Sequence, residues 1–381
     1  MMNIIKKQGY TKLSRVQIFT SSCDGTAKIW GLDGTCTTTL LGHSGSVWSV
    51  VRLSNGQIAT TSEDKTVKIW NLDGTCTATL PGHDGPASNV IQLSNGQIAS
   101  GSENCTVKIW NLDGTCSATL SGHTDCVLVV TELRNGQIAT GSHDKTVKIW
   151  KLDGTCTATL SGRKTSVRSV TELSNGQIIA HGRDNIVNVW RLDGTCTAVF
   201  LGHTEYVLSV IELRNGQIAT RSWDSTMKIW NLDGTCTATL SGHNGLPRSM
   251  IELRNGQIAT SSQDQTVKIW NLDGTCTATF SGHKNTVMSI IELSNGQIAS
   301  YSGDLTVKIW NLDGTCTATL SGHTAYLQSM IELSNGQLGT SSIDKTAKIW
   351  RLDGTCTATL FGHTDIVLSI VELGDCCGGD V

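Results

Sequence analysis

The sequence predicts an all-β fold, a ring of four-stranded antiparallel sheets, and three observations support this prediction. Tryptophan recurs every 40 residues from Trp30 to Trp350 without an insertion. Each unit contains four short runs of residues with high β-propensity, separated by turns such as Asn-Gly and Asp-Gly. No helical periodicity competes with this pattern. Four strands in about 40 residues are typical of one blade of a β-propeller.

The unit spanning residues 42–80 shows how the expected strands follow one another. Asn55-Gly56 and Asp73-Gly74 predict hairpin turns, because both residues of such pairs tolerate positive φ. A further turn passes through Asp64. The four strands expected around these turns are residues 47–53, 57–62, 66–72 and 76–80.

Three short motifs in this unit resemble the WD-repeat family: Gly42-His43, the Ser-x-Asp at residues 62–64, and Ile69-Trp70. The resemblance covers residues 13–373. The chain departs from the family at the Trp-Asp dipeptide, because Asn, Lys, Arg or Gly follows each tryptophan. The resemblance implies a structural tetrad in which Trp donates to Ser, Ser to His, and His to Asp. The matching residues are His43, Ser62, Asp64 and Trp70 in one unit and His203, Ser222, Asp224 and Trp230 in another.

A Ser/His/Asp set also describes a hydrolase triad. Here the set is repeated around the chain, and neither an oxyanion hole nor a nucleophile elbow accompanies it. The histidines occur one per unit and cannot converge on one metal ion. We therefore expect no catalytic residue, no metal site and no cofactor.

The first and last units predict how the ring closes. The N-terminal unit supplies three strands, residues 16–22, 26–31 and 36–40, but its own first-strand region, residues 7–12, matches the repeat poorly. Residues 366–372 supply a spare first strand, and pairing the two removes exposed sheet edges. This predicts a nine-bladed propeller over residues 13–373, an irregular segment at 1–12 and a flexible tail at 374–381. A fragment of a longer array and a smaller ring with spare units remain alternatives.

Composition narrows the classes of function. The 29 Lys and Arg nearly balance the 32 Asp and Glu, which argues against a nucleic-acid binder. No apolar run is long enough for a membrane helix. Nine cysteines recur one per unit, too far apart for disulfides, so we expect reduced thiols packed within their own units and a cytoplasmic, monomeric ring. These are Cys36, Cys76, Cys116, Cys156, Cys196, Cys236, Cys276, Cys316 and Cys356.

Differences between the units gather in a few columns, whereas Leu-Asp-Gly-Thr-Cys is identical in every unit. These columns lie near the fourth-to-first and second-to-third strand connections, which emerge on the same face of a propeller, here named the top face. Drift in loops would explain some of this, but drift should also have changed the outer strand. We therefore predict partner contacts at Trp48, Glu63, Glu103, His143, Arg168, His181, Arg183, Tyr206, Arg221, Trp223, Arg248, Gln263, Tyr301 and Tyr326.

Charge on this face is uneven. Basic residues gather on the three units that end at Trp190, Trp230 and Trp270, together with Tyr206 and Trp223; they are Arg163, Lys164, Arg168, Arg183, Arg221 and Arg248. An earlier arc carries Glu63, Asp84, Glu103 and Asp125. We expect a non-catalytic scaffold that binds an acidic protein segment or peptide over the basic units. The alternative is binding of a glycan or small molecule at the channel mouth.

Two imperfect units predict differences in stability. The unit ending at Trp190 has Arg163 in place of His and Gly182 in place of Ser, which is expected to leave Asp184 and Trp190 without their tetrad partners. The unit ending at Trp110 has Asn104 in place of Asp. A lost buried partner costs about 1–3 kcal/mol. The blade ending at Trp190 is therefore expected to be the least stable.

Overall fold

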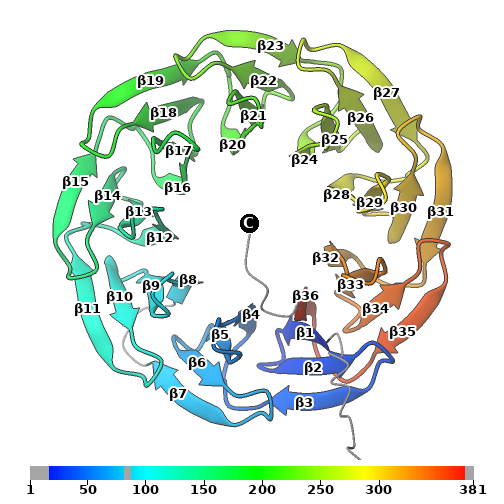
Figure 1. The fold of residues 1–381 in the computed structure, drawn as a ribbon. Helices are drawn as coiled ribbons and strands as arrows, with labels where there is room; N and C mark the ends of the chain where they lie inside the picture. Colours follow the sequence, from blue (N-terminus) through cyan, green and yellow to red (C-terminus); the bar gives the residue numbers. More distant parts are fainter. Residues whose placement is uncertain (1–16, 81–86, 374–381) are drawn as a thin grey trace, which may run out of the picture.

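The computed structural model describes residues 17–80 and 87–373, which form a closed ring of nine four-stranded antiparallel sheets (Figure 1). The strands around the centre are β36 (Val367–Leu373), β4 (Val47–Arg52), β8 (Ala87–Gln92), β12 (Val127–Glu132), β16 (Val167–Glu172), β20 (Val207–Glu212), β24 (Pro247–Glu252), β28 (Val287–Glu292) and β32 (Leu327–Glu332). The second strands are β1 (Gln17–Ser22), β5 (Ile58–Ser62), β9 (Ile98–Ser102), β13 (Ile138–Ser142), β17 (Ile178–Gly182), β21 (Ile218–Ser222), β25 (Ile258–Ser262), β29 (Ile298–Ser302) and β33 (Leu338–Ser342).

The outer half of each sheet is equally regular. The third strands are β2 (Ala27–Gly31), β6 (Val67–Trp70), β10 (Thr106–Trp110), β14 (Val147–Trp150), β18 (Ile186–Trp190), β22 (Met227–Trp230), β26 (Thr266–Trp270), β30 (Thr306–Trp310) and β34 (Ala347–Trp350). The outermost strands are β3 (Cys36–Leu40), β7 (Cys76–Leu80), β11 (Cys116–Ser121), β15 (Cys156–Leu160), β19 (Cys196–Leu201), β23 (Cys236–Leu240), β27 (Cys276–Ser281), β31 (Cys316–Ser321) and β35 (Cys356–Leu360).

We number the sheets as blades. Blade 1 contains β36 with β1, β2 and β3, blade 2 contains β4 to β7, and the numbering continues to blade 9, which contains β32 to β35. The pairing of β36 with β1 runs from Gln17 opposite Leu373 to Ser22 opposite Val367. The predicted nine-bladed closure is therefore confirmed, and the smaller ring with spare units is excluded. Residues 1–16, 81–86 and 374–381, with the expected N-terminal segment, Asp84 and the expected tail, lie outside the described residues.

The hydrophobic cores lie between neighbouring blades. Trp70 of β6 packs against Phe19, Ile29 and Leu40 of blade 1, and it is almost fully buried. Gly42 has a φ of 152°, and a Cβ atom there would lie 3.3 Å from the edge of the Trp70 ring. The glycine of the Gly-His pair is therefore favoured, because the chain passes close to the buried tryptophan with a φ that other residues rarely adopt.

A β-bulge occurs near the start of each central strand. In blade 2 the pairing register shifts between Val47 and Ser49, so Trp48 is the extra residue. The same shift places Arg168, Arg248 and Met288 at bulges in their own blades. A bulge turns a side chain away from its regular direction. One of the variable columns is thus the bulge itself.

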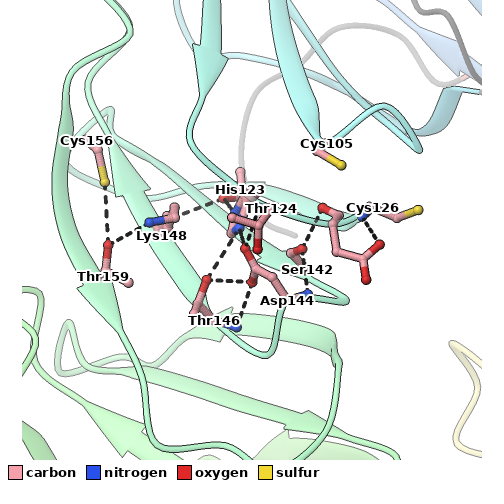
Figure 2. A network of polar contacts seen from close by, with 12 residues as sticks. Cys105, His123, Thr124, Cys126, Ser142, Asp144, Thr146, Lys148, Cys156 and Thr159 are labelled. Atoms are coloured by element: carbon pink, nitrogen blue, oxygen red, sulfur yellow. Dashed lines mark hydrogen bonds and ion pairs between the residues drawn. The ribbon is translucent and has the colours of Figure 1, made fainter.

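The nine repeated cysteines occupy the outermost strands and are exposed. The expectation that they are packed within their units is wrong, because the outer strand has no further blade to cover it. Cys156 Sγ lies 3.9 Å from Thr159 Oγ1, which accepts from Lys148 Nζ at 2.9 Å (Figure 2). The same Sγ donates to the Ala158 carbonyl at 3.4 Å. The described residues contain no helix with the length and apolar character that crossing a membrane requires.

Candidate protein-binding face

A tetrad of polar side chains ties together the strands of most blades. In blade 4, His123 Nδ1 donates to Asp144 Oδ2 at 2.7 Å, as Figure 2 shows from close by. On the other side of the His123 imidazole, Nε2 lies 2.7 Å from Thr140 Oγ1, which also accepts from Trp150 Nε1 at 2.8 Å. All four side chains are largely buried. The chain of hydrogen bonds runs from the blade core to the top face.

The hydroxyl in this tetrad is not the serine that the sequence predicted. In blade 2, Trp70 Nε1 donates to Thr60 Oγ1 at 2.7 Å, and His43 Nε2 lies 2.8 Å from the same oxygen. Ser62 instead donates to the Gly45 carbonyl and accepts from the Asp64 amide. Trp70 pairs with Ile58, so the nearest diagonal neighbour on that face is two residues further on, at position 60.

Blade 6 repeats this correction. Thr220 Oγ1 lies 2.7 Å from His203 Nε2 and accepts from Trp230 Nε1 at 2.8 Å. Ser222 donates to the Glu205 carbonyl at 3.0 Å and holds the loop that leads into β20. The predicted His203, Asp224 and Trp230 keep their roles, since His203 Nδ1 lies 2.7 Å from Asp224 Oδ2.

The protonation states fit a structural role. Burial lowers the pKa of His43 below 6.5, although Asp64 opposes this, so the ring is neutral at neutral pH. Burial works to raise the pKa of Asp64, but hydrogen bonds from Thr66, Ser44 and His43 outweigh it and lower the pKa to about 2. A neutral His therefore donates from Nδ1 to an ionised Asp and accepts from the Thr60 hydroxyl at Nε2. Each polar side-chain group of this tetrad therefore has a hydrogen-bond partner, and Thr60 is fully buried.

Blade 5 replaces the tetrad with a different network. Arg163 occupies the place of the His, is fully buried, and forms an ion pair with Asp184. Its Nη1 donates to the Ala180 carbonyl at 2.8 Å and to Asn188 Oδ1 at 3.1 Å. The expectation that Asp184 loses its partner is thus wrong, and so is the placement of Arg163 on the surface. For Trp190 the expected loss concerns the hydroxyl: residue 180, which corresponds to Thr60 of blade 2, is an alanine and offers none.

The top-face turn of blade 5 is also rebuilt. Val207 N–H of blade 6 donates to the Asp184 carbonyl at 2.8 Å, and Asn185 Nδ2 donates to the His203 carbonyl at 3.0 Å. The equivalent residues of the adjoining blades, Lys145 and Ser225, have φ of 72° and 66°, a left-handed conformation that Asn185 does not share. The turn of blade 5 is therefore held by hydrogen bonds to blade 6.

Beside this turn lies a hollow of about 770 Å³ between blades 5 and 6, here named hollow A. Its lining contains five residues that the sequence predicted as partner contacts: Arg168, His181, Arg183, Tyr206 and Trp223. The aromatic rings of Tyr206 and Trp223 lie 6.4 Å apart, and Trp223 is 56% exposed. His181 is almost fully buried in the wall, and its Nδ1 has no hydrogen-bond partner among the described residues.

Two further hollows continue around the top face. Hollow B, of about 450 Å³, lies between blades 6 and 7 and shares Trp223 with hollow A. Hollow C, of about 400 Å³, lies over blades 8 and 9 and shares Arg248 with hollow B. Gln263 lines hollow B, while Tyr301 and Tyr326 line hollow C. The three hollows therefore follow one another around the top face from blade 5 to blade 9, and together they are here named the track.

Positive charge dominates the first two hollows. No residue that lines any of the three hollows is acidic, and no ion pair among the described residues involves Arg168, Arg183, Arg221 or Arg248. Partial burial and the charge of Arg183 lower the pKa of Arg168. Burial and the charge of Arg248 lower the pKa of Arg221 to about 10. Two pairs of like charges thus face each other without a counter-charge.

The structure does not bring all predicted contacts together. Trp48, Glu63, Glu103 and His143 are exposed on blades 2 to 4, away from the three hollows. Arg221 is half-buried, and it donates to Ser209 Oγ at 3.2 Å and to the Pro247 carbonyl at 2.6 Å. Arg221 therefore links blade 6 to blade 7 through hydrogen bonds, and its guanidinium is not freely presented to solvent.

Several residues of the track are absent from the predicted contacts, among them Gly245 and Asn285. Gly245 lines hollow B and Asn285 lines hollow C, and each follows a tetrad His by two positions. The signal was present, since this column also varies from unit to unit, with Asp125, Thr165 and Glu205 at the equivalent positions. Within the described residues, no three His, Cys, Asp or Glu side chains gather as a metal site would need.

Comparison with solved structures shows the fold. The chain resembles the crystal structure of the computationally designed Ika8 protein with a TM-score of 0.64 and 22% sequence identity, over 82% of this chain and 98% of that one. No curated protein matches the sequence.

The sequence profile of the "WD domain, G-beta repeat" family matches eight segments. They are residues 34–71, 74–111, 114–151, 154–191, 194–231, 234–271, 274–311 and 314–351. The strands outside these segments lie on either side of the ring closure: β36, β1 and β2 belong to blade 1, and β35 is the outermost strand of blade 9. These matches cover most of the chain, so the protein belongs to the WD40-repeat family.

Proposed function

We propose that this protein is a non-catalytic interaction scaffold whose top face holds an acidic, extended segment of a partner protein. The segment lies in hollows A and B, across blades 5 to 7. The observation that carries this proposal is the pair of adjacent hollows with Arg168, Arg183 and Arg248 in their walls and no carboxylate in their lining. Carboxylates of a partner supply the missing counter-charge.

The side chains in the track suit recognition of a protein. Trp, Tyr and Arg are the residue types over-represented at binding hot spots. Trp223 stands between hollows A and B, so a segment that crosses from one to the other passes over its ring. Arg248 Nε is buried and lacks a hydrogen-bond partner among the described residues. Because this atom is buried, it belongs to the wall of the track and is not itself a contact for the partner.

A glycan or small molecule in hollow A is the second candidate. The volume of about 770 Å³ and the Tyr206–Trp223 pair favour it. Against it, the aromatic pair occurs in one place, whereas hollows B and C extend the site beyond the length of a small ligand.

The test is selection of a random peptide library on the full chain, followed by binding measurements with variants. The variant Arg168→Ala/Arg183→Ala/Trp223→Ala removes three exposed side chains of the track. We leave Arg221 in place because its hydrogen bonds to blade 7 make it part of the structure. Selected peptides are expected to be rich in Asp and Glu and to lose most of their affinity for this variant.

The matched control changes the same face on the other side of the ring, Trp48→Ala/Glu63→Ala/Glu103→Ala, and is expected to keep full affinity. Equal thermal unfolding of both variants shows that neither has lost the ring. Peptides without acidic enrichment, or with unchanged affinity for the first variant, contradict the proposal. Saturable binding of glycans but not of peptides supports the second candidate.

A further inference from the structure

Hollow C differs in chemistry from the two hollows that precede it. Its walls include Met288, which is 40% exposed, and Tyr326, which is 55% exposed, together with Leu327 and Ile343. Apart from Arg248 at its boundary with hollow B, it contains no charged residue. The track therefore changes from basic to apolar between blades 7 and 8.

The variable columns of the sequence create this change. The residue before the tetrad Asp is Arg183 in blade 5, but it is Gly303 in blade 8 and Ile343 in blade 9. The bulge residue is Arg168 in blade 5 and Met288 in blade 8. The same structural positions thus present arginines at one end of the track and apolar groups at the other.

Two details show that the hollow is a formed pocket and not a loose surface. Tyr301 of β29 donates through its hydroxyl to the Gln328 carbonyl of β32 at 3.3 Å, and this bond fixes the Tyr301 side chain between blades 8 and 9. At Gly303 a Cβ atom would lie 3.1 Å from Asn285 Cγ. Asn285 Nδ2 donates to the Gly303 carbonyl and Asn285 Oδ1 accepts from the Thr286 amide, so this wall is held in place.

We propose that hollow C is a subsite for one bulky apolar side chain, aromatic or long aliphatic, of the same acidic segment that hollows A and B hold. The partner is then a segment with a cluster of carboxylates and an apolar anchor at a fixed spacing from it. This inference rests on the proposed function, because hollow C adjoins the basic hollow B at Arg248, which lines both. The volume of about 400 Å³ accommodates a side chain as large as tryptophan.

The experiment compares peptide selection on three forms of the full chain: wild type, Met288→Glu/Tyr326→Ser, and the control Trp48→Ser. All three replaced side chains are exposed, and equal thermal unfolding verifies the fold. Peptides selected on the wild type and the control are expected to carry an acidic cluster and one Trp, Phe, Leu, Ile or Met at a constant offset. Peptides selected on the double variant are expected to keep the acidic cluster and lose the constant apolar position.

A second measurement links the two sides of the contact. Replacing the apolar anchor of a selected peptide with Ala is expected to weaken binding to the wild type by about tenfold to a hundredfold. The same replacement leaves affinity for the double variant unchanged, because the hollow is already altered. An anchor that is selected equally on the double variant, or an Ala peptide that binds the wild type as tightly as its parent, overturns the inference.

The outcomes separate this inference from the proposed function. Acidic peptides without a constant apolar position leave the scaffold function in place and contradict the role of hollow C. Apolar peptides that depend on Met288 and Tyr326 but carry no acidic cluster support the apolar subsite and contradict the acidic partner. A selection that yields no peptide competing for the top face contradicts both.

Discussion

Thr20 and His363 lie 343 positions apart in the sequence, yet Thr20 Oγ1 is 2.7 Å from His363 Nε2. Trp30 Nε1 donates to the same hydroxyl, and His363 Nδ1 lies 2.9 Å from Asp24 Oδ2. The tetrad of blade 1 is therefore assembled from both ends of the described chain. It fastens β36 to β1 with the same contacts that hold a continuous blade together.

Replacing His363 with Ala is expected to weaken the closure specifically. The loss removes one hydrogen-bond partner from Thr20 Oγ1 and one from Asp24 Oδ2, which costs about 1–3 kcal/mol. His323→Ala in blade 9 is the matched control, because it removes the same contacts within one continuous segment. Hydrogen exchange of β1 and β36 amides should be faster in the His363 variant than in the control. Equal exchange in the two variants would show that the closure does not depend on this tetrad.

Acid is expected to destabilise the ring in two stages. Burial lowers the pKa of His123, His203 and His243 below 6.5, so at these residues the folded protein binds fewer protons than the unfolded chain once the pH falls below that value. The free energy of unfolding therefore decreases as the pH falls from neutral to about 5. A further decrease follows from pH 3.8 towards about 2, because the pKa of Asp144 is lowered to about 2.

Urea unfolding at a series of pH values measures this effect. The urea midpoint should fall steadily below pH 6.5 while the denaturant slope stays constant. A midpoint that does not change between neutral pH and about pH 5 would mean that the histidines are not held neutral in the folded state.

The outer cysteines are expected to react in the folded protein. Cys76 and its equivalents are exposed, whereas Cys105 and Cys126 are half-buried. Burial, together with nearby Asp125, raises the pKa of both of these thiols, which disfavours the reactive thiolate. Brief alkylation without denaturant, read by peptide mass spectrometry, should label the outer thiols first. Labelling of Cys126 ahead of Cys76 would contradict the structure.

Most of the fold was predictable from the sequence because its signals are local and repeated. The Asn-Gly and Asp-Gly turns set the hairpins, and the constant spacing of Trp30 and its equivalents set the blades. The ring closure followed from one incomplete unit and one spare strand. Convergence of Arg168, Arg183, Tyr206 and Trp223 in hollow A also followed, since the connections that carry them emerge on one face.

The errors arose where the register between paired strands, and not the local sequence, determines which side chains meet. Thr60 and Ser62 point to the same face of β5, and only the pairing of Trp70 with Ile58 selects the threonine. The bulge at Trp48 leaves no mark in the sequence. Arg163 looked like a lost histidine when it was considered alone, but Ala180 and Asn188 change with it, and together they form a replacement network.

Blade 5 is still expected to be less stable than its neighbours, for a reason that the structure makes specific. Four buried polar atoms there lack hydrogen-bond partners among the described residues: Arg163 Nε, Thr165 Oγ1, His181 Nδ1 and Asp184 Oδ2. Each such atom costs about 1–3 kcal/mol. Amides of β17 and β18 should exchange faster than those of β21 and β22 in blade 6. Exchange at equal rates would mean that ordered water satisfies these atoms.

Restoring the consensus serine at position 182 is expected to harm the protein. A Cβ atom at Gly182 would lie much closer to the Ser166 carbonyl than any real contact allows, so Gly182→Ser forces the rebuilt turn to move. We expect a loss of about 1–3 kcal/mol in the free energy of unfolding, as for other overpacked sites. The reverse change in blade 4, Ser142→Gly, is the control, and it removes two hydrogen bonds without creating a clash. Because the Asp184 carbonyl accepts from Val207 beside hollow A, Gly182→Ser should also weaken binding of acidic peptides, whereas Ser142→Gly should not. Unaltered stability and affinity in the Gly182 variant would show that blade 5 tolerates the consensus turn, and that its rebuilt form is not what shapes hollow A.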